Sequence, residues 1–336
     1  MRKILITGGV GFIGTNCVQY FAQQGHQLVL VDDFSRVGVK QNAAYLRQHF
    51  PQLKLIKASV QQPAKYLTEL KQAQVVIHLA GQTAVTTSIK NPQHDFNNNL
   101  MAGFKLLETV RKHNPKAVLL YASTNKVYGD LAHHQFKKDF SKEQYLNLTV
   151  PQGVTEQEQI NLISPYGCSK GAVDFYWQDY ARIYGLKTVV FRQSCIYGPF
   201  QMGVEDQGWV AHFSKQILKD QPITIFGDGF QVRDLLYVGD LIQAYDLAIN
   251  KIAQVKGEVF NIGGGVKNSF SLLNVIELLQ KQTKHSVKVD FASARAGDQL
   301  YFVSANQRIE KLLGWQPQTK FVQGLKQLVA WQKKHL

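Results

Sequence analysis

The 336-residue sequence predicts an α/β fold, a doubly wound parallel sheet followed by a smaller mixed α/β domain. Up to about Val190, short β-branched or leucine-rich runs alternate with longer stretches of helical period. This alternation is typical of a parallel sheet wrapped by helices, because each connection must carry the chain back across a buried sheet. Beyond "RQSCIYGPF" (192–200) the pattern changes to mixed short segments, which indicates a second, smaller domain.

The strands expected in the first part are "KILIT" (3–7), "QLVLVDD" (27–33), "LKLIKAS" (53–59), "VVIHLA" (75–80), "AVLLYAS" (117–123) and "KTVVFR" (187–192). Polar residues without a clear period from Leu131 to Ile163 predict a long surface loop. Later come a helix near 209–220, a turn at 226–230, a strand at 260–265 and a helix over 271–283. We expect a first domain over 1–190, joined by about 234–263, and a second over the rest of 191–336.

Composition excludes several classes of protein. The formal net charge is +14, but the lysines are spread along the chain without a basic motif interleaved with aromatics, which favours an anionic substrate over nucleic acid. No apolar run approaches the roughly 20 residues of a membrane span, and the start does not continue as a signal peptide, so we expect a cytoplasmic protein. Three distant cysteines form neither a disulfide framework nor a zinc motif, and the pair His133 and His134 is expected to be solvated, so we expect no metal.

A glycine-rich turn directly follows the first strand and opens a helix. Gly8 permits a tight turn, Gly11 lets the backbone approach a pyrophosphate, and Gly14 allows close helix packing. The next strand ends in Asp32, near the spacing at which an acid accepts hydrogen bonds from the adenosine ribose. Together they predict a Rossmann-type site for NAD, since a carboxylate repels the 2′-phosphate of NADP; Arg36 nearby leaves NADP open.

The stretch "SPYGCSK" places Tyr166 and Lys170 one helical turn apart, with Ser164 as the expected cap and Pro165 as the first helical residue. A lysine ammonium beside a phenol, together with the positive nicotinamide ring of bound NAD, is expected to lower the phenol pKa, so that Tyr166 can take a proton from a substrate hydroxyl. Thr124, at the end of the fifth strand, would hydrogen-bond that hydroxyl. We therefore predict Thr124, Tyr166 and Lys170 as the catalytic residues.

With these motifs the chain resembles the extended short-chain dehydrogenase/reductases of the nucleotide-sugar epimerase and dehydratase group. The glycine turn, "HLAGQTAVTTS", the threonine strand, the Tyr-Lys pair, "YGP" and "GDGFQVRDLLYVGD" all follow the order of that family. The resemblance implies an NAD-binding enzyme acting on a nucleotide sugar. It implies a cofactor site that adds to Gly8, Gly11, Asp32, Tyr166 and Lys170 the residues Phe12, Ile13, Asp33, Ser35, Arg36, Ser59, Val60, Leu79, Ala80, Gly81, Asn99 and Ser123.

The same resemblance implies a substrate site in which Arg233 and Arg295 hold the pyrophosphate, a role that suits the planar guanidinium fork. Its other expected members are Gln82, Thr86, Thr124, Cys195, Gln207 and Trp209. Where the 4,6-dehydratases of the family carry Asp and Glu after the catalytic threonine, this chain has Asn125 and Lys126. Because neither can serve as the carboxylate acid and base of elimination, the resemblance favours an epimerase.

The motifs "STNKVYGD", "SPYGCSKGA", "LAGQTAVTTSI" and "DQGWV" are most similar to the CDP-tyvelose (CDP-paratose) 2-epimerases of this family, which act on a sugar of bacterial surface polysaccharide. This similarity implies inversion at C2 of a CDP-linked dideoxyhexose. Cys195 replaces a common asparagine of the family, and Ser59 replaces an aspartate that contacts adenine. A 4-epimerase of a UDP- or CDP-hexose shares every residue named here, and a non-catalytic NAD-binding protein would share the fold.

The resemblance further suggests a homodimer or homotetramer. The helices expected at Asn99–Val110 and Ala172–Tyr184 are candidates for the subunit interface. Their apolar faces could equally pack on the sheet, so the sequence leaves both arrangements open.

Overall fold

The computed structural model describes residues 1–295 and 297–335 and divides into two compact units. Unit 1 comprises 1–124, 164–192 and 242–260, and unit 2 comprises 125–163, 193–241 and the described part of 261–336. The expected assignment of cofactor binding to 1–190 and substrate binding to 191–336 stays a prediction. Among the described residues, no helix combines the length and the apolar character that crossing a membrane requires.

Unit 1 is built on a seven-stranded sheet in the order β12-β8-β5-β4-β1-β2-β3. The pairings of β1 with β2, β1 with β4, β2 with β3, and β4 with β5 are all parallel. The strands are β1 (Lys3–Thr7), β2 (Gln27–Asp32), β3 (Lys54–Lys57), β4 (Val75–His78), β5 (Val118–Thr124), β8 (Lys187–Gln193) and β12 (Val259–Ile262). The sheet confirms the predicted α/β fold class, and all six strands predicted in the first part of the chain are present.

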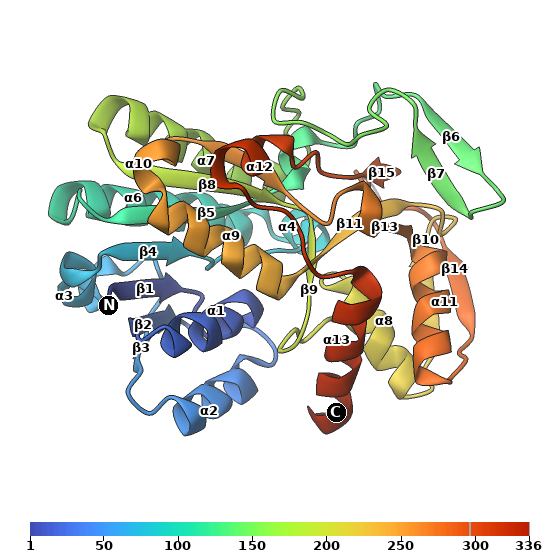
Figure 1. Cartoon of the computed structure of the whole chain (residues 1–336), viewed down its shortest axis with the longest axis horizontal. Helices are drawn as coiled ribbons and strands as arrows, with labels where there is room; N and C mark the ends of the chain where they lie inside the picture. The colour runs from blue at the N-terminus through green and yellow to red at the C-terminus, as the bar shows by residue number, and fades with distance from the viewer. Residues whose placement is uncertain (296, 336) are drawn as a thin grey trace. The chain divides into compact units, whose positions relative to one another are not determined.

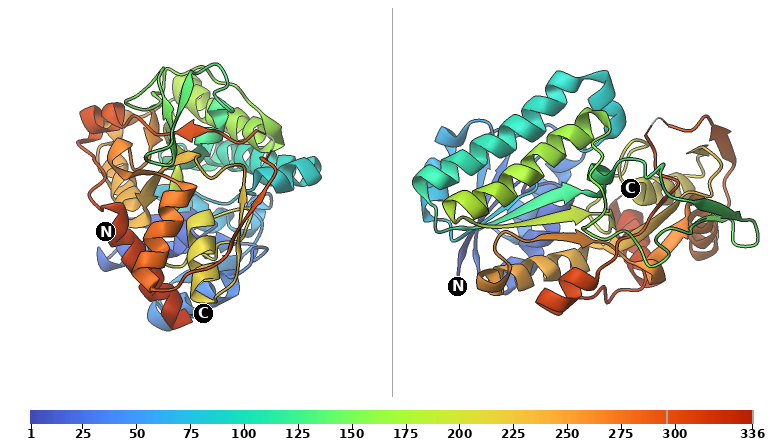
Figure 2. Two further views of the ribbon diagram at one scale, coloured as in Figure 1. Left: turned by 90° about the vertical axis from the view of Figure 1, so that its right-hand side faces the viewer. Right: turned by 90° about the horizontal axis from the view of Figure 1, so that it is seen from above.

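Helices cover both faces of this sheet, with α6 and α7 on one face and α1, α2 and α9 on the other (Figures 1 and 2). The Tyr20 hydroxyl of α1 donates to Asp246 of α9 at 3.2 Å, so these two helices are neighbours. The helical segments are α1 (Phe12–Gln23), α2 (Val39–His49), η1 (Pro63–Lys65), α3 (Leu67–Gln72), α4 (Val85–Lys90), α5 (Pro92–Phe96), η2 (Asn97–Met101, a π-helix), α6 (Ala102–His113), α7 (Ser164–Tyr184), α9 (Val238–Asn250) and α10 (Ile252–Val255).

The core of unit 1 explains why the apolar runs become central strands. Leu5, Val76 and Leu119 of three neighbouring strands are buried in one cluster with Trp177 of α7. Strands covered on both faces exclude water from nearly every side chain, so they read as continuous apolar runs. In register, Thr7 pairs with Val31 and His78, so the carboxyl ends of the strands lie along one edge, where ligands bind in open α/β sheets.

Unit 2 contains a four-stranded sheet with the order β13-β11-β15, in which β9 also pairs with β11. A parallel pair β10-β14 and an antiparallel hairpin β6-β7 complete its strands. The elements are η3 (Asn125–Tyr128), β6 (Phe136–Asp139), β7 (Gln144–Asn147), β9 (Cys195–Tyr197), α8 (Trp209–Leu218), β10 (Ile223–Phe226), β11 (Val232–Tyr237), η4 (Val266–Asn268), β13 (Ser269–Ser271), α11 (Leu272–Thr283), β14 (Val289–Ala292), β15 (Tyr301–Phe302), α12 (Gln307–Leu313) and α13 (Phe321–His335).

The two helices predicted in this part of the chain are confirmed as α8 and α11. Ser271 accepts a hydrogen bond from the backbone N–H of Asn274 in a capping box, which fixes the start of α11. The expected loop from Leu131 to Ile163 was wrong in one respect, because it contains the β6-β7 hairpin. The hairpin is held by tertiary contacts, such as the bond from the Tyr145 N–H to the Phe230 carbonyl at 2.9 Å, and local sequence does not reveal these.

Candidate active site

The glycine turn after β1 has the geometry that phosphate binding requires. Gly8 has a φ of +69°, and a Cβ there would lie 2.8 Å from the backbone nitrogen of Ala80. A Cβ on Gly14 would lie 2.5 Å from the Gly8 carbonyl oxygen, so this position has no room for a side chain. Within the described chain no side chain caps the start of α1, whose first turn holds the uncharged Phe12 and Ile13. The positive end of the helix therefore faces the turn, and the site fits a pyrophosphate.

Asp32 lies at the carboxyl end of β2 and is nearly buried. Its carboxylate accepts hydrogen bonds from the N–H groups of Val10 at 3.2 Å and Phe34 at 2.9 Å. Burial raises the pKa of Asp32, and these two backbone bonds oppose the rise. The guanidinium of Arg36 interacts electrostatically with both Asp32 and Tyr166, although burial lowers its own pKa. The bond from Val10 holds the Asp32 carboxylate beside the glycine turn, where a residue that positions the adenosine ribose must lie.

The other expected cofactor residues at this edge make local contacts. Asp33 accepts bonds from the N–H and the hydroxyl of Ser35, at 3.0 and 2.6 Å, which shapes the turn after β2. After β3, the Ser59 hydroxyl accepts a bond from the Gln61 N–H at 3.3 Å, and the Val60 carbonyl accepts one from the Tyr66 hydroxyl at 2.7 Å. Their contacts with adenine stay predictions.

The segment after β4 approaches a buried amide. Leu79 and Ala80 are hydrogen-bonded to Thr7 of β1, and Gly81 faces the side chain of Asn99, whose Oδ1 would lie 2.5 Å from a Cβ at that glycine. Asn99 lies in the π-helix η2, and among the described residues its buried Oδ1 has no hydrogen-bond partner. A π-helical turn beside an unsatisfied buried acceptor is typical of a functional site, and a ligand with a donor group fits here.

Thr124, Tyr166 and Lys170 come from two elements of unit 1. Thr124 ends β5, and the other two lie one turn apart in α7, where the Ser164 hydroxyl accepts a bond from the Gly167 N–H at 3.2 Å. The predicted cap is thereby confirmed. The Tyr166 N–H donates to the Ser88 hydroxyl at 3.1 Å, and the Thr124 side chain hydrogen-bonds the Tyr166 phenol. All three side chains are less than 10% exposed (6%, 8% and 8%), so the reactive groups are shielded from water.

Burial has the largest effect on the titration of Tyr166 and Lys170. Burial raises the pKa of Tyr166 to about 12, while Thr124 and Arg36 act in the opposite direction. Burial also lowers the pKa of Lys170 to about 7, against the pull of Asp174 and Asp95. The Lys170 ammonium donates to the Ala122 carbonyl and lies 4.3 Å from the centroid of the Tyr121 ring. The predicted lowering of the tyrosine pKa depends on the positive nicotinamide ring of bound NAD as well as on Lys170, so it stays a prediction.

Several buried polar residues around Lys170 were missed by sequence reasoning. Asp174 pairs with Arg192 of β8 through two bonds of 3.0 and 3.1 Å and accepts a bond of 2.7 Å from the hydroxyl of Ser123, an expected cofactor residue. Asp95 accepts a bond from the Asn99 amide at 2.8 Å. A charged or polar residue inside an apolar run, such as Arg192 in "KTVVFR", is the sequence signal for such a buried pair.

His78 in "VVIHLA" gives the same signal. Its Nδ1 lies 2.7 Å from the Thr7 hydroxyl, and burial with the nearby Lys170 lowers its pKa to about 3. His78 is therefore neutral at any physiological pH. Its ring stacks on those of Tyr121 and Trp177, which also contact each other, so the three rings form one buried cluster at the end of β4.

The expected substrate residues of unit 1 follow β4. The Gln82 amide folds back on Ala84, with bonds from its Nε2 to the carbonyl and from the Ala84 N–H to its Oε1. In the described structure the buried hydroxyl of Thr86 has no hydrogen-bond partner. Thr86 is thus available to a ligand, whereas Gln82 is occupied locally.

In unit 2, Cys195 lies in β9, paired with Leu235 of β11. Burial raises the pKa of its thiol, opposed by Arg233 and by a hydrogen bond with Trp209. A raised pKa disfavours the thiolate, which agrees with a lining rather than a nucleophilic role. Trp209 opens α8 and packs on the ring of Phe213 at 5.4 Å, and Gln207 is bridged through its backbone to Val204.

The two arginines expected to bind pyrophosphate are each held by carboxylates of unit 2. Arg233 donates to Asp298 at 2.7 Å and to the carbonyl of Val232. Arg295 lies over the Phe226 ring at 3.8 Å and pairs with Glu205 and Asp206, both at 3.2 Å. Both guanidinium groups are therefore restrained in place.

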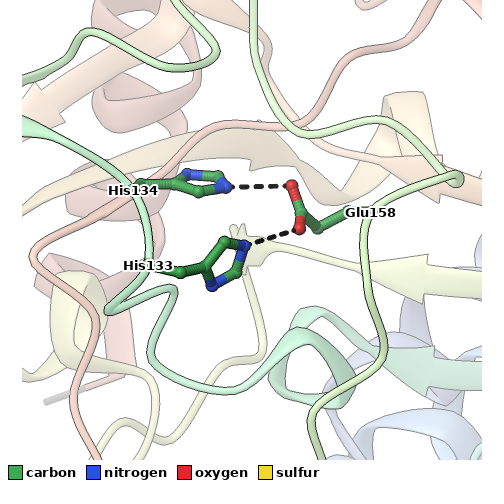
Figure 3. Close-up of side chains that lie close together, drawn as sticks. All are labelled: His133, His134 and Glu158. Carbon is green, nitrogen blue, oxygen red and sulfur yellow. Dashed lines mark hydrogen bonds and ion pairs between the residues drawn. The ribbon is translucent and has the colours of Figure 1, made fainter.

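His133, His134 and Glu158 form a compact group in unit 2, in which both rings point their Nε2 at the carboxylate (Figure 3). Each Nε2 lies 3.0 Å from one Glu158 oxygen. The Asn147 oxygen accepts two backbone N–H groups, so its amide nitrogen must donate to His134 Nδ1 at 2.8 Å. His134 consequently carries its proton on Nε2, where a metal ion would need a lone pair. The expectation that the pair is solvated was wrong for His134, whose side chain is 1% exposed.

Comparisons with known proteins identify the family of the chain. The sequence profile described as the NAD dependent epimerase/dehydratase family matches residues 4–263. The chain is 38% identical to CDP-paratose 2-epimerase of Salmonella typhi, with 98% of each chain covered, and 30% identical to a putative UDP-glucose 4-epimerase of Methanocaldococcus jannaschii, with 99% of each covered. The structure of UDP-glucuronic acid 4-epimerase from Bacillus cereus in complex with UDP-glucuronic acid and NAD superposes with a TM-score of 0.85 at 28% identity, covering 99% of this chain and 100% of that one.

The family match covers the glycine turn, the Thr-Tyr-Lys group and the whole large sheet. The family, the Rossmann-type fold and NAD as cofactor, all predicted from the sequence, are thereby confirmed. The chain belongs to the NAD dependent epimerase/dehydratase family.

Proposed function

We propose that this enzyme epimerises a nucleotide sugar by transient oxidation of one carbon and reduction from the opposite face, at C2 of CDP-paratose to give CDP-tyvelose or the reverse. The observation that carries the proposal is the buried group of Thr124, Tyr166 and Lys170. Thr124 is followed in the sequence by Asn125 and Lys126, which are not acids. The 38% identity to a CDP-paratose 2-epimerase supports the choice of sugar.

Tyr166 is the proposed general base. Its phenolate takes the proton of the sugar hydroxyl and becomes the phenol, and Thr124, which already hydrogen-bonds the Tyr166 oxygen, orients that hydroxyl. NAD, which the glycine turn and Asp32 would hold, would supply the hydride acceptor and donor for this carbon, and its positive ring would favour the phenolate. Lys170 adds positive charge one turn after Tyr166 in α7, and Asp174 and Asp95 favour the charged form of the lysine.

The residues after Thr124 support epimerisation over dehydration. The Asn125 amide donates to Gln299 at 3.2 Å, and the Lys126 ammonium contacts Asp298 at 3.3 Å. An amide has no acid–base pKa near neutral pH, and an ammonium offers a donor where elimination needs a base. The oxidised sugar is therefore left with one productive outcome, which is reduction.

Arg233 and Arg295 are proposed to bind the diphosphate, and Gln82, Thr86, Cys195, Gln207 and Trp209 to line the nucleotide and sugar site. The buried, raised-pKa thiol of Cys195 is a poor hydrogen-bonding group, which suits a sugar with few hydroxyls. A second candidate, a UDP- or CDP-hexose 4-epimerase, is favoured by the 30% identity to a putative UDP-glucose 4-epimerase.

We also propose that the enzyme is a homodimer or homotetramer built on the outer faces of α6 and α7. Four large side chains of α7 are between 43% and 53% exposed, namely Phe175, Tyr176, Ile183 and Tyr184. A second copy would remove this apolar surface from water. Sedimentation at micromolar concentration tests it, since a monomer would contradict the proposal.

The function is tested by incubating the protein with CDP-paratose, CDP-glucose and UDP-glucose separately and following each by proton NMR. Inversion at C2 changes the coupling between H1 and H2, whereas inversion at C4 changes the couplings along H3 to H5. Deuterium placed at the reacting carbon should stay in the product, and exchange with heavy water there would refute hydride transfer. Inversion at C4 would select the second candidate, and no turnover of any sugar would favour a non-catalytic NAD-binding protein.

A further inference from the structure

Three charged side chains of unit 2 meet at one oxygen atom. Asp298 Oδ1 accepts a bond from Arg233 Nη2 at 2.7 Å and from Lys126 Nζ at 3.3 Å. The same oxygen also accepts the backbone N–H of Gln299 at 3.0 Å. One carboxylate oxygen thus serves three donors, of which the lysine is the most distant.

The group carries more positive than negative charge. Two cations share a single carboxylate, and the side chains of Arg233, Lys126 and Asp298 are 8%, 21% and 33% exposed. Burial and the nearby Arg233 lower the pKa of Lys126, although Asp298 acts in the opposite direction. A partly buried cation whose partner already serves another cation is stabilised by a further anion.

The surroundings indicate where that anion would come from. Lys126 and Arg233 both lie close enough to Cys195 to affect the pKa of its thiol, and Cys195 also contacts Trp209. Arg233, Cys195 and Trp209 are proposed to bind the substrate, whereas Lys126 has no assigned role. Asp298 is also joined to Arg295 through its backbone N–H, which donates to the Arg295 carbonyl at 3.2 Å.

We propose that Lys126, together with Arg233, binds the diphosphate of the nucleotide sugar. This inference rests on the proposed function for its substrate class. The anionic oxygen could also belong to a sugar carboxylate, but a guanidinium and an ammonium on one centre match the several oxygens and two charges of a diphosphate. Lys126, which stands where the dehydratases of the family carry an acid for elimination, would then bind the diphosphate.

The test is the affinity of the full-length, NAD-loaded protein for CDP and UDP by calorimetry, with cytidine and uridine measured by ligand-observed NMR. Lys126→Gln should weaken CDP or UDP about 10- to 100-fold, the loss of one charge-assisted bond, and change nucleoside binding less than about twofold. Lys126→Arg, which keeps the charge, should recover most of the affinity. The wild-type affinity should fall with added salt more steeply than that of Lys126→Gln.

Lys138→Gln is the matched control, because Lys138 of β6 also pairs with one carboxylate of unit 2, Asp228 at 2.9 Å, and lies outside the proposed site. It should bind CDP as the wild type does. The proposal is overturned if Lys126→Gln retains wild-type CDP affinity, if it loses nucleoside and diphosphate alike, or if neither CDP nor UDP binds the wild type. UDP-glucuronate and UDP-glucose are measured in the same way. If Lys126→Gln loses affinity for UDP-glucuronate but not for UDP-glucose, the lysine binds a sugar carboxylate and the proposal is overturned. Lys126-dependent CDP binding without epimerisation of any sugar would support this inference and refute the proposed reaction.

Discussion

The charged groups of the two units are balanced in opposite ways. In unit 1, Lys170 is 8% exposed and is surrounded by buried acids, Asp95 and Asp174, the second of which is paired with Arg192. In unit 2, Lys126 and Arg233 share one carboxylate, Asp298, which is one-third exposed. Lys170 therefore has buried acids around it within unit 1, whereas two cations of unit 2 share one carboxylate.

This difference suggests separate tasks. A reaction centre needs donors and acceptors fixed before the substrate arrives and shielded from water. An anion site needs cations that a ligand can reach and neutralise, so part of its charge must stay uncompensated. We therefore expect substitutions in unit 1 to act on turnover and stability, and substitutions in unit 2 to act on substrate affinity.

The largest effect is expected for Tyr166→Phe, which removes the proposed base. Turnover should fall about 10³- to 10⁴-fold, the upper part of the range for general acid–base groups, because no other described side chain is placed to replace the phenol. Bound NAD, measured by absorbance after denaturation, should be unchanged. A variant that keeps more than about a tenth of the wild-type rate would show that Tyr166 is not the base.

The next effect concerns the ion pair behind Lys170. Asp174→Asn should lower the free energy of unfolding by about 3–5 kcal/mol, because it leaves Arg192 buried without its counter-charge. Urea denaturation measures this change. Asp179→Asn is the control on the same helix, because Asp179 pairs with Arg182 at an exposed site (48% and 73%), and it should cost less than about 1 kcal/mol. An equal loss of unfolding free energy for Asp174→Asn and Asp179→Asn would show that the buried ion pair contributes no more to stability than the exposed one.

Lys170 itself predicts a pH dependence of stability. Its pKa of about 7 in the folded protein lies below the ordinary value of 10.5, so between these pH values the unfolded chain binds more protons than the folded protein. Stability from this group therefore rises with pH across that window. Relative to Lys170→Met, the cofactor-free wild type should gain about 1–3 kcal/mol between pH 7 and 9.5 in urea denaturation. A difference that does not change with pH would show that Lys170 titrates normally.

The parts of the site that sequence reasoning predicted depend on short spacings. The glycine turn and the pair Tyr166 and Lys170 are specified by residues within one turn or one helical repeat, so they could be read locally. The ion pair of Asp174 with Arg192 joins a helix to the next strand, and Asp95 reaches Lys170 only through the packing of α5 against α7. Which acid compensates which base depends on tertiary structure.

The fold shows the same limit. The central strands were predicted because burial on both faces makes each of them apolar throughout. The β6 strand, Phe136–Asp139, has two exposed lysines at its centre and no comparable apolar run. It was therefore missed. The pKa of Tyr166 depends on tertiary structure in the same way, since desolvation comes from neighbours distant in sequence.

The smallest effect tests the expected role of Arg295 in unit 2. Arg295→Gln should raise the KM for the nucleotide sugar about tenfold and leave kcat nearly unchanged, because a phosphate contact is made equally before and during the reaction. Arg308→Gln, at an exposed position of α12, is the control and should change neither value. Steady-state kinetics with the sugar identified by NMR measures both.

Arg295 pairs with Glu205 and Asp206, so a diphosphate must compete with these acids, and the gain from binding is smaller than for a free cation. A fall in kcat at constant KM would mean that Arg295 acts on the reacting sugar, and the division of tasks between the two units would then fail.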